Sequence, residues 1–251
     1  MSSTRRALPD GPLRQERFCS SPELERGLLA NLVAKRCEVL ANSGNRELIW
    51  FLQYLSHGYG GLRKVAEDLG RMYPGNRGCR IPVDLEKLLA GLCLNPKSKI
   101  ESDLFPNLFP ALQECRRQLI EEVRTKRVVT TLGQQVFDTL DYALKGRCLV
   151  LIEGLARTGK TFGTKTWCEL HPGQARYIQV PSTNDDFGFF RAIARSLGVS
   201  INLNSKAQQL RDRIEDVLQH GDLMPVFDEA HYLWPQRNWR EALPARINWI
   251  M

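Results

Sequence analysis

Eight consecutive residues in the second half of the chain have the types and spacing needed to hold a phosphate group. They are Gly154-Leu155-Ala156-Arg157-Thr158-Gly159-Lys160-Thr161, followed by Phe162, and they match the pattern G-x-x-x-x-G-K-[ST]. Gly154 allows a tight turn, and Gly159 lets backbone N–H groups approach a phosphate without a Cβ in the way. Lys160 supplies a positive charge for the β- and γ-phosphates, and the Thr161 hydroxyl is placed to ligate Mg²⁺. The segment predicts a site for a nucleoside triphosphate, with ATP and Mg²⁺ as the expected ligands.

Two neighbouring acidic residues further along the chain are the candidates for the metal and the chemistry. They end the segment Leu223-Met224-Pro225-Val226-Phe227-Asp228-Glu229. An apolar strand that ends in Asp-Glu places both carboxylates at the carboxyl edge of a parallel sheet, beside a phosphate loop. We expect Asp228 to hold Mg²⁺, usually through water, and Glu229 to orient and deprotonate an attacking water. Pro225 is an irregularity, because proline removes a ladder donor, so we place it at the start of the strand.

Strands that alternate with helices must position these groups. We expect strands at 148–152, 176–180 and 223–227. The first should be buried on both faces of the sheet, because all of its residues are apolar. Helices are expected at 160–170, at 187–197 before Gly198, and from a capping box of Ser205 and Gln208 to Gly221. This order predicts an α/β fold of the P-loop NTPase kind, with a parallel sheet and flanking helices.

The first half of the chain predicts only helices. We expect them at 22–40, 46–57, 62–69, 82–92, 111–127 and 132–144. The polar residues 1–20 predict a disordered leader, and three prolines predict a linker over 93–110. The expected division is a leader (1–20), an all-α module (21–95), a linker with a charged helix (96–127) and a nucleotide-binding core (128–251).

The net charge of +7 lies mainly in the first half of the chain. The first 147 residues contain 23 Lys and Arg against 17 Asp and Glu, whereas the remainder contains 12 against 11. This imbalance is typical of a polyanion-binding module beside a catalytic one, but a mildly basic solvated surface would give the same numbers. No apolar run is long enough to cross a bilayer and no signal peptide is apparent, so we expect a cytoplasmic protein without membrane contact.

Basic residues around a helix-turn-helix-like pattern are the candidates for DNA contact. They are Arg63, Lys64, Arg71, Arg77 and Arg80. Ala66 and Gly70 have the spacing of a first helix and turn, but Pro74-Gly75 interrupts the place where a recognition helix should begin. We therefore expect these side chains to contact phosphates, without sequence preference, rather than bases. A helical module that docks a protein partner is the alternative.

The phosphate loop and the acidic pair resemble those of the AAA+ ATPases. Within that group the chain is similar to the ATPase subunits of DNA transposition, of the phage Mu B type. A helical module precedes the core, Val128-Val129-Thr130-Thr131-Leu132 introduces a helix before the first strand, and the spacing from the loop to Asp228-Glu229 is short. The resemblance implies ATP-binding roles for Gly154, Gly159, Lys160 and Thr161. It also implies homo-oligomer assembly on DNA and partnership with a transposase or other recombination protein.

Two departures from the AAA+ pattern affect these expectations. Arg157 stands where many AAA+ loops have glycine, so the loop conformation or a contact with the ligand is expected to differ, and a side chain that faces solvent is an equal alternative to a contact with the nucleotide. The chain ends at Met251, before the sensor residue, arginine finger and helical lid that the resemblance implies. We therefore expect a shortened core that binds a nucleotide but does not hydrolyse it efficiently.

Two further functions are open on the sequence alone. One is another AAA+ factor of DNA metabolism, such as a helicase loader or a replication initiator. The other is a non-hydrolysing interaction module that binds ATP or ADP and occupies a partner. A DEAH-box helicase is disfavoured despite Asp228-Glu229-Ala230-His231, because that family needs further motifs and a second ATPase domain, for which the sequence has no room.

Overall fold

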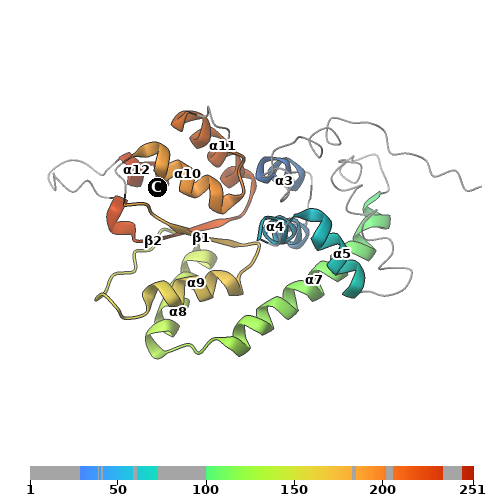
Figure 1. Cartoon of the computed structure of the whole chain (residues 1–251), viewed down its shortest axis with the longest axis horizontal. Helices are drawn as coiled ribbons and strands as arrows, with labels where there is room; N and C mark the ends of the chain where they lie inside the picture. The colour runs from blue at the N-terminus through green and yellow to red at the C-terminus, as the bar shows by residue number, and fades with distance from the viewer. Residues whose placement is uncertain are drawn as a thin grey trace, which may run out of the picture.

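The structure is a computed structural model of the chain, and it describes residues 29–38, 40, 42–58, 61–72, 100–182, 185–201, 206–233 and 245–251 (Figure 1). The described helices are α3 (Ala30–Cys37), α4 (Ser43–Gly58), α5 (Leu62–Met72), α7 (Ile100–Lys126), α8 (Thr131–Gly146), α9 (Lys160–Leu170), α10 (Asp186–Leu197), α11 (Ala207–His220), α12 (Ala245–Ile250) and the 3₁₀ helix η3 (Ala230–Leu233). The strands are β1 (Ala175–Gln179) and β2 (Met224–Asp228). None of these helices is long and apolar enough to cross a membrane.

The two strands pair in parallel and are covered on both sides by helices. Figure 1 shows α10 and α11 on one side of the strands and α8 and α9 on the other. Ile178 of β1 packs in the core with Phe189 of α10. Val226 of β2 packs on the opposite side with Trp167 of α9. This arrangement confirms the predicted α/β fold, and it places the strands within one residue of the positions expected from the sequence.

The strand predicted at residues 148–152 is wrong, because these residues do not form a strand in the structure. In the described part of the chain the only strand pairing is between β1 and β2. Leu149 and Leu151 are 65% and 68% exposed, whereas Ile152 packs beside the core. The apolar run therefore alternates between solvent and protein and is not buried on two faces. A strand needs a neighbour for its N–H and C=O groups, and no described segment provides one here.

The helices around the site begin and end largely where the sequence predicts. Thr130 Oγ1 accepts a hydrogen bond from Gly133 N at 3.1 Å at the start of α8. Asp185 caps α10, and Gly198 ends it in the left-handed conformation with φ 74°. The capping box expected for α11 is shifted by one residue, since Lys206 N donates to Gln209 Oε1 at 3.2 Å. Its predicted first member, Ser205, lies outside the described residues.

Helix α7 corrects the linker predicted over 93–110, of which residues 93–99 lie outside the described part. The helix begins at Ile100 and includes both Pro106 and Pro110. A proline inside a helix costs about 3 kcal/mol, because it lacks an N–H and its ring crowds the preceding turn. The neighbouring Leu108 and Leu112 are fully buried. Burial of a leucine contributes about 1.5–3 kcal/mol, so packing offsets the helix-breaking tendency of the prolines.

Helix α4 packs tightly on loops at the amino ends of the strands. Gly173 lies before β1, Gly198 follows α10, and Gly221 lies before β2. A Cβ at these glycines would lie 2.9 Å from Glu47 O, 2.1 Å from Gln53 Nε2 and 2.5 Å from Trp50 Cζ2, respectively. The close approach explains why residues without side chains stand there. Helix α4 therefore covers the amino ends of the strands, whereas Asp228 lies at the carboxyl end of β2.

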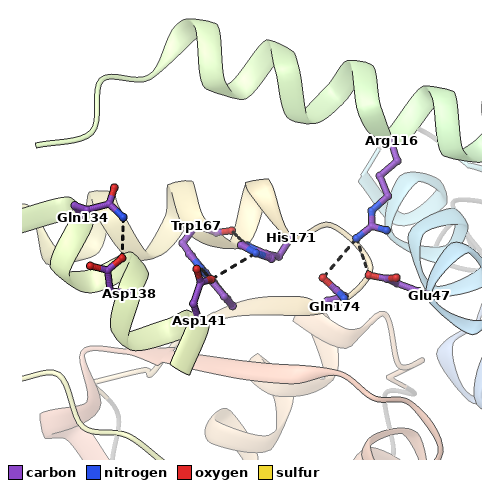
Figure 2. A network of polar contacts seen from close by, with 8 residues as sticks. All are labelled: Glu47, Arg116, Gln134, Asp138, Asp141, Trp167, His171 and Gln174. Atoms are coloured by element: carbon purple, nitrogen blue, oxygen red, sulfur yellow. Dashed lines mark hydrogen bonds and ion pairs between the residues drawn. The ribbon is translucent and has the colours of Figure 1, made fainter. Parts of the chain in front are cut away.

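Polar contacts reinforce this packing. Arg116 of α7 donates to Glu47 Oε1 at 2.7 Å and to Gln174 Oε1 at 3.5 Å, which joins α7, α4 and the loop before β1 (Figure 2). The buried Arg176 of β1 donates to Gln53 Oε1 at 3.0 Å. Burial lowers the pKa of Arg176 to about 10, so the guanidinium still carries its charge at neutral pH. The domain division proposed above stays a prediction, but α3 and α4 share one hydrophobic core with α10 and α11.

Replacing Gly221 by alanine tests the packing of α4. The added methyl group would lie 2.5 Å from the indole of Trp50, which is 2% exposed and cannot move aside. We expect the free energy of unfolding to fall by about 1–3 kcal/mol, the usual cost of overpacking a core. Urea unfolding followed by circular dichroism measures it. Gly58→Ala, on α4 itself, is the matched control because its methyl group meets no atom within 4 Å. Equal stability of the two variants would contradict the described contact.

Candidate nucleotide-binding site

The predicted phosphate loop forms a turn that leads directly into α9. Gly159 is the N-cap of this helix, has φ 87°, and no side chain caps the helix there. The N–H groups in the first turn of a helix have no intrahelical acceptor, and together with the helix dipole they attract anions. Backbone φ near 87° favours glycine. The geometry therefore explains the residue type at Gly159 and gives α9 a terminus suited to a phosphate.

Lys160 lies inside the curve of the loop. Its Nζ donates to Gly154 O at 2.7 Å, to Leu155 O at 2.5 Å and to Thr158 Oγ1 at 3.4 Å. The Thr158 hydroxyl in turn donates to Leu155 O at 2.9 Å. The neighbouring Thr161 is exposed in the first turn of α9. The Lys160 ammonium thus bonds the backbone of its own loop, and Thr161, whose hydroxyl is predicted to bind Mg²⁺, is the next residue in the chain.

Arg157 adopts a left-handed backbone conformation. Its φ is 64°, and the residue is exposed. This conformation costs a residue with a Cβ about 1–2 kcal/mol, which is a physical reason for glycine to be common at such a position. The loop accommodates arginine without leaving the left-handed region. A contact between Arg157 and a ligand stays a prediction.

The predicted acidic pair stands at the carboxyl end of β2. Asp228 is the last residue of the strand, and its backbone C=O accepts from Val180 N at 3.0 Å. Its Oδ2 accepts a hydrogen bond from the Tyr177 hydroxyl at 2.7 Å. Glu229 follows with φ 56°, and its Oε2 lies 3.3 Å from His231 Nδ1. Because α9 packs on both strands, the loop that begins this helix and the acidic pair belong to one side of the domain.

The oxygen groups fit the magnesium ion that a nucleotide would bring. Mg²⁺ prefers carboxylate and hydroxyl oxygens together with phosphates and water, and it usually takes one or two carboxylates from the protein. Asp228 and Thr161 supply a carboxylate and a hydroxyl. No cluster of three or more His, Cys, Asp or Glu suited to a metal occurs within the described ranges. The donor set therefore suits an ion held jointly with phosphates better than a structural metal.

Helix α9 is locked to α8 by the buried Trp167. The indole Nε1 donates to Asp141 Oδ1 at 2.8 Å, and the ring stacks on His171 with centroids 4.1 Å apart (Figure 2). His171 Nε2 lies 3.7 Å from the same Asp141 oxygen. This cluster holds the far end of α9, and the rigidity of the helix carries the constraint to Lys160.

Sequence reasoning missed an apolar patch beside the loop, formed by Val128, Val129 and Phe162. Val128 and Phe162 are 82% and 46% exposed, and Val129 is also exposed. Helices α8 and α9 approach closely, with a Cβ at Gly163 lying 3.6 Å from Gly133 Cα. The Arg127 guanidinium lies 5.3 Å from the Phe162 ring centroid. The apolar residues around 128 were the available signal, but only the fold shows that Phe162 contacts Arg127, the residue before them.

Two of the five predicted DNA-binding residues, Lys64 and Arg71, have side chains in the described part of the chain, and both lie apart from this site. Lys64 and Arg71 are exposed on α5, which packs among the N-terminal helices. Arg63 lies in the same helix, and its side chain is outside the description, as are Arg77 and Arg80 entirely. Helix α5 continues through Gly70 to Met72, so the turn expected at Gly70 is wrong. The predicted helix at 82–92 also lies outside the described residues.

Comparison with known proteins agrees with this geometry. Residues 143–248 match a protein-family model described as an AAA domain. The matched interval contains the phosphate loop, both strands and the acidic pair. No curated protein and no solved structure matches the chain. The fold is therefore that of an α/β P-loop NTPase with a helical N-terminal region, and the AAA-domain match over residues 143–248 indicates nucleotide-dependent activity.

Removing the Asp141 carboxylate tests the connection between α8 and α9. Asp141→Ala leaves the buried Trp167 N–H without an acceptor, and such a loss costs about 1–3 kcal/mol. We expect the free energy of unfolding to fall by that amount, and Asp141→Asn, which retains an acceptor oxygen, to recover most of it. Asp138→Ala is the matched control on the same helix, since Asp138 accepts only from the exposed Gln134 in Figure 2. An equal loss in Asp138→Ala would contradict the role of Asp141.

Proposed function

We propose that this protein binds ATP with Mg²⁺ and acts in DNA transposition, where the nucleotide controls its binding to DNA, to a transposase or to both. The observation that carries the nucleotide site is the position of Lys160 within the loop, with Asp228 at the end of the neighbouring strand. The matched AAA domain supports the same assignment. The finer assignment to transposition rests on the resemblance described above.

Different residues of the proposed site bind the phosphates, hold Mg²⁺ and accept a proton. The N–H groups at the start of α9 and the Lys160 ammonium bind and orient the phosphates. Thr161 and Asp228 hold Mg²⁺, which supplies charge neutralisation at the phosphates when it is bound. Glu229 takes the proton of a water molecule, provided that its carboxylate turns from His231 toward that water.

The apolar patch gives the proposed site a place for the base. Phe162 is exposed two residues after Lys160 in α9, and the exposed Val128 and Val129 follow Arg127, whose guanidinium lies 5.3 Å from the Phe162 ring centroid. Ligand sites commonly combine apolar contacts with a few placed polar groups. The flat faces of a purine and of the Phe162 ring are suited to stacking. We infer that this patch receives the adenine.

The exposed face of α5 supports the proposed contact with DNA. Lys64 and Arg71 are seven residues apart, which places them on one side of the helix, whereas Val65 and Leu69 are buried. Arg71 lies 3.3 Å from Asp68, so one of the two cations is partly balanced. Two cations suit contact with phosphates in the absence of base recognition. A helicase loader or replication initiator would use the same two surfaces and differ only in its partner.

A non-hydrolysing module is the second candidate, and one contact favours it. Glu229 has a left-handed backbone and its carboxylate faces His231 at 3.3 Å. In this orientation His231 competes with water for one of the two carboxylate oxygens. Tight nucleotide binding without turnover would identify this candidate. DNA-stimulated turnover would instead identify the ATPase of DNA transposition proposed first.

Lys160→Ala tests the nucleotide site. The substitution removes the one predicted cation at the phosphates, so we expect affinity for ATP to fall at least about tenfold, consistent with the strength of charge-assisted contacts. Isothermal titration calorimetry with Mg²⁺ and ATP measures the affinity. Lys145→Ala, which removes an exposed lysine of α8, is the control and should bind like the wild type. Equal affinity of the wild type and Lys160→Ala would refute the proposed site.

The double variant Lys64→Ala/Arg71→Ala tests DNA binding by α5. If both side chains contact phosphates, the slope of log affinity against log salt concentration should decrease by about 2, close to 0.9 for each contact. Fluorescence anisotropy with a labelled duplex at several salt concentrations provides the slope. The control Lys126→Ala/Lys145→Ala removes the same charge, and Lys126 has an acidic helix neighbour, Glu122, as Arg71 has Asp68. The same decrease in both variants would indicate a general charge effect and refute a specific role of α5.

A further inference from the structure

Tyr177 and Asp228 meet across the two parallel strands at the edge of the candidate site. In the register of β1 and β2, Tyr177 is opposite Val226 and Gln179 is opposite Asp228. Residues two apart on a strand share a face, so Tyr177 and Asp228 lie on the same face of the sheet. Val226 packs with Trp167 of α9 on this face. The hydroxyl of Tyr177 donates to Asp228 Oδ2 at 2.7 Å.

The tyrosine hydroxyl is held in place by both helical layers. The ring lies under Lys165 of α9, whose Nζ is 4.9 Å from the ring centroid. The backbone C=O of Tyr177 accepts a hydrogen bond from Ser196 Oγ of α10 at 2.8 Å. The Tyr177 side chain is partly buried beside the core on this face, and its hydroxyl donates to Asp228.

The hydrogen bond leaves the carboxylate able to serve a cation. An ionised carboxylate has two oxygens with about four acceptor positions, and Tyr177 uses one of them on Oδ2. The backbone of Asp228 is fixed separately by Val180 N. The Asp228 side chain can still rotate about its own bonds, and the hydrogen bond from Tyr177 restricts this rotation. A fixed carboxylate binds an ion or its water without first losing that freedom.

We propose that Tyr177 is a positioning residue that orients the Asp228 carboxylate for the Mg²⁺ that accompanies the nucleotide. The inference rests on the proposed function, because it assigns a partner to one group of that site. Tyr177 acts through Asp228 and contacts neither the phosphates nor the base. Its contribution therefore concerns nucleotide binding with Mg²⁺ and leaves metal-free binding to the phosphate loop unchanged.

The test compares Tyr177→Phe with the wild type, using a fluorescent ATP analogue in the presence of Mg²⁺ and in EDTA. Phenylalanine keeps the ring under Lys165 and removes only the donor. We expect unchanged affinity in EDTA and affinity lower by about three- to tenfold with Mg²⁺, in line with the loss of a hydrogen bond to a charged group. The retained affinity in EDTA also demonstrates that the variant is folded. Tyr142→Phe, at an exposed position of α8, should change neither value.

A double-mutant cycle separates positioning from a structural role. In an Asp228→Ala background, Tyr177→Phe should have no further effect on affinity with Mg²⁺, because the group through which it acts is absent. An equal loss with and without Mg²⁺, the same loss in the Asp228→Ala background, or no loss at all would each overturn the inference. These results leave the nucleotide site itself intact. The nucleotide site fails only if the wild type and Lys160→Ala do not differ in binding.

Discussion

The parallel pairing of β1 with β2 is the constraint on which the site depends. Its register sets Gln179 opposite Asp228 and brings Tyr177 within hydrogen-bonding distance of the Asp228 carboxylate. A shift by one residue would turn Asp228 to the face covered by α10, because alternate residues of a strand point to opposite faces. Packing of Ile178 and Val226 into different cores opposes such a shift. The hydrophobic pattern of two short strands thus determines which side of the sheet carries the acidic group.

Strand β1 contacts both the N-terminal helices and the candidate site. Arg176 points toward α4 and bonds Gln53, whereas its neighbour Tyr177 points toward α9 and bonds Asp228. The N-terminal helices therefore support the sheet at the amino ends of its strands, and Asp228, which is proposed to hold the metal, lies at the other end. Tight contact with α4 requires glycine at 173, 198 and 221. Changes in this contact should affect the stability of the fold before they affect the geometry of the loop.

Local patterns predicted the parts of the fold that depend on neighbouring residues. The phosphate loop, α9, β1 and β2 were predicted because glycine spacing, capping residues and apolar runs act over a few positions. The segment 148–152 was mispredicted, since an apolar run forms a strand only when another strand pairs with it. Tyr177 was not recognised because its partner is 51 positions away, and only the register brings them together. The first part of helix α7 was not predicted, because its two prolines disfavour a helix locally. Burial of Leu108 and Leu112 stabilises the helix, and this burial depends on the tertiary fold rather than on neighbouring residues.

The charged groups of the site already have partners within the chain, and these partners differ in what ligand binding requires of them. Lys160 contacts neutral oxygens of its own loop, and a phosphate is a stronger acceptor because its negative charge adds the attraction between opposite charges. Asp228 can keep its bond to Tyr177 and use its other oxygen. Glu229, in contrast, has His231 as a competing partner at one of its two oxygens. For the proposed function, binding therefore requires that one lysine side chain exchange its acceptors, whereas turnover also depends on the contact between Glu229 and His231.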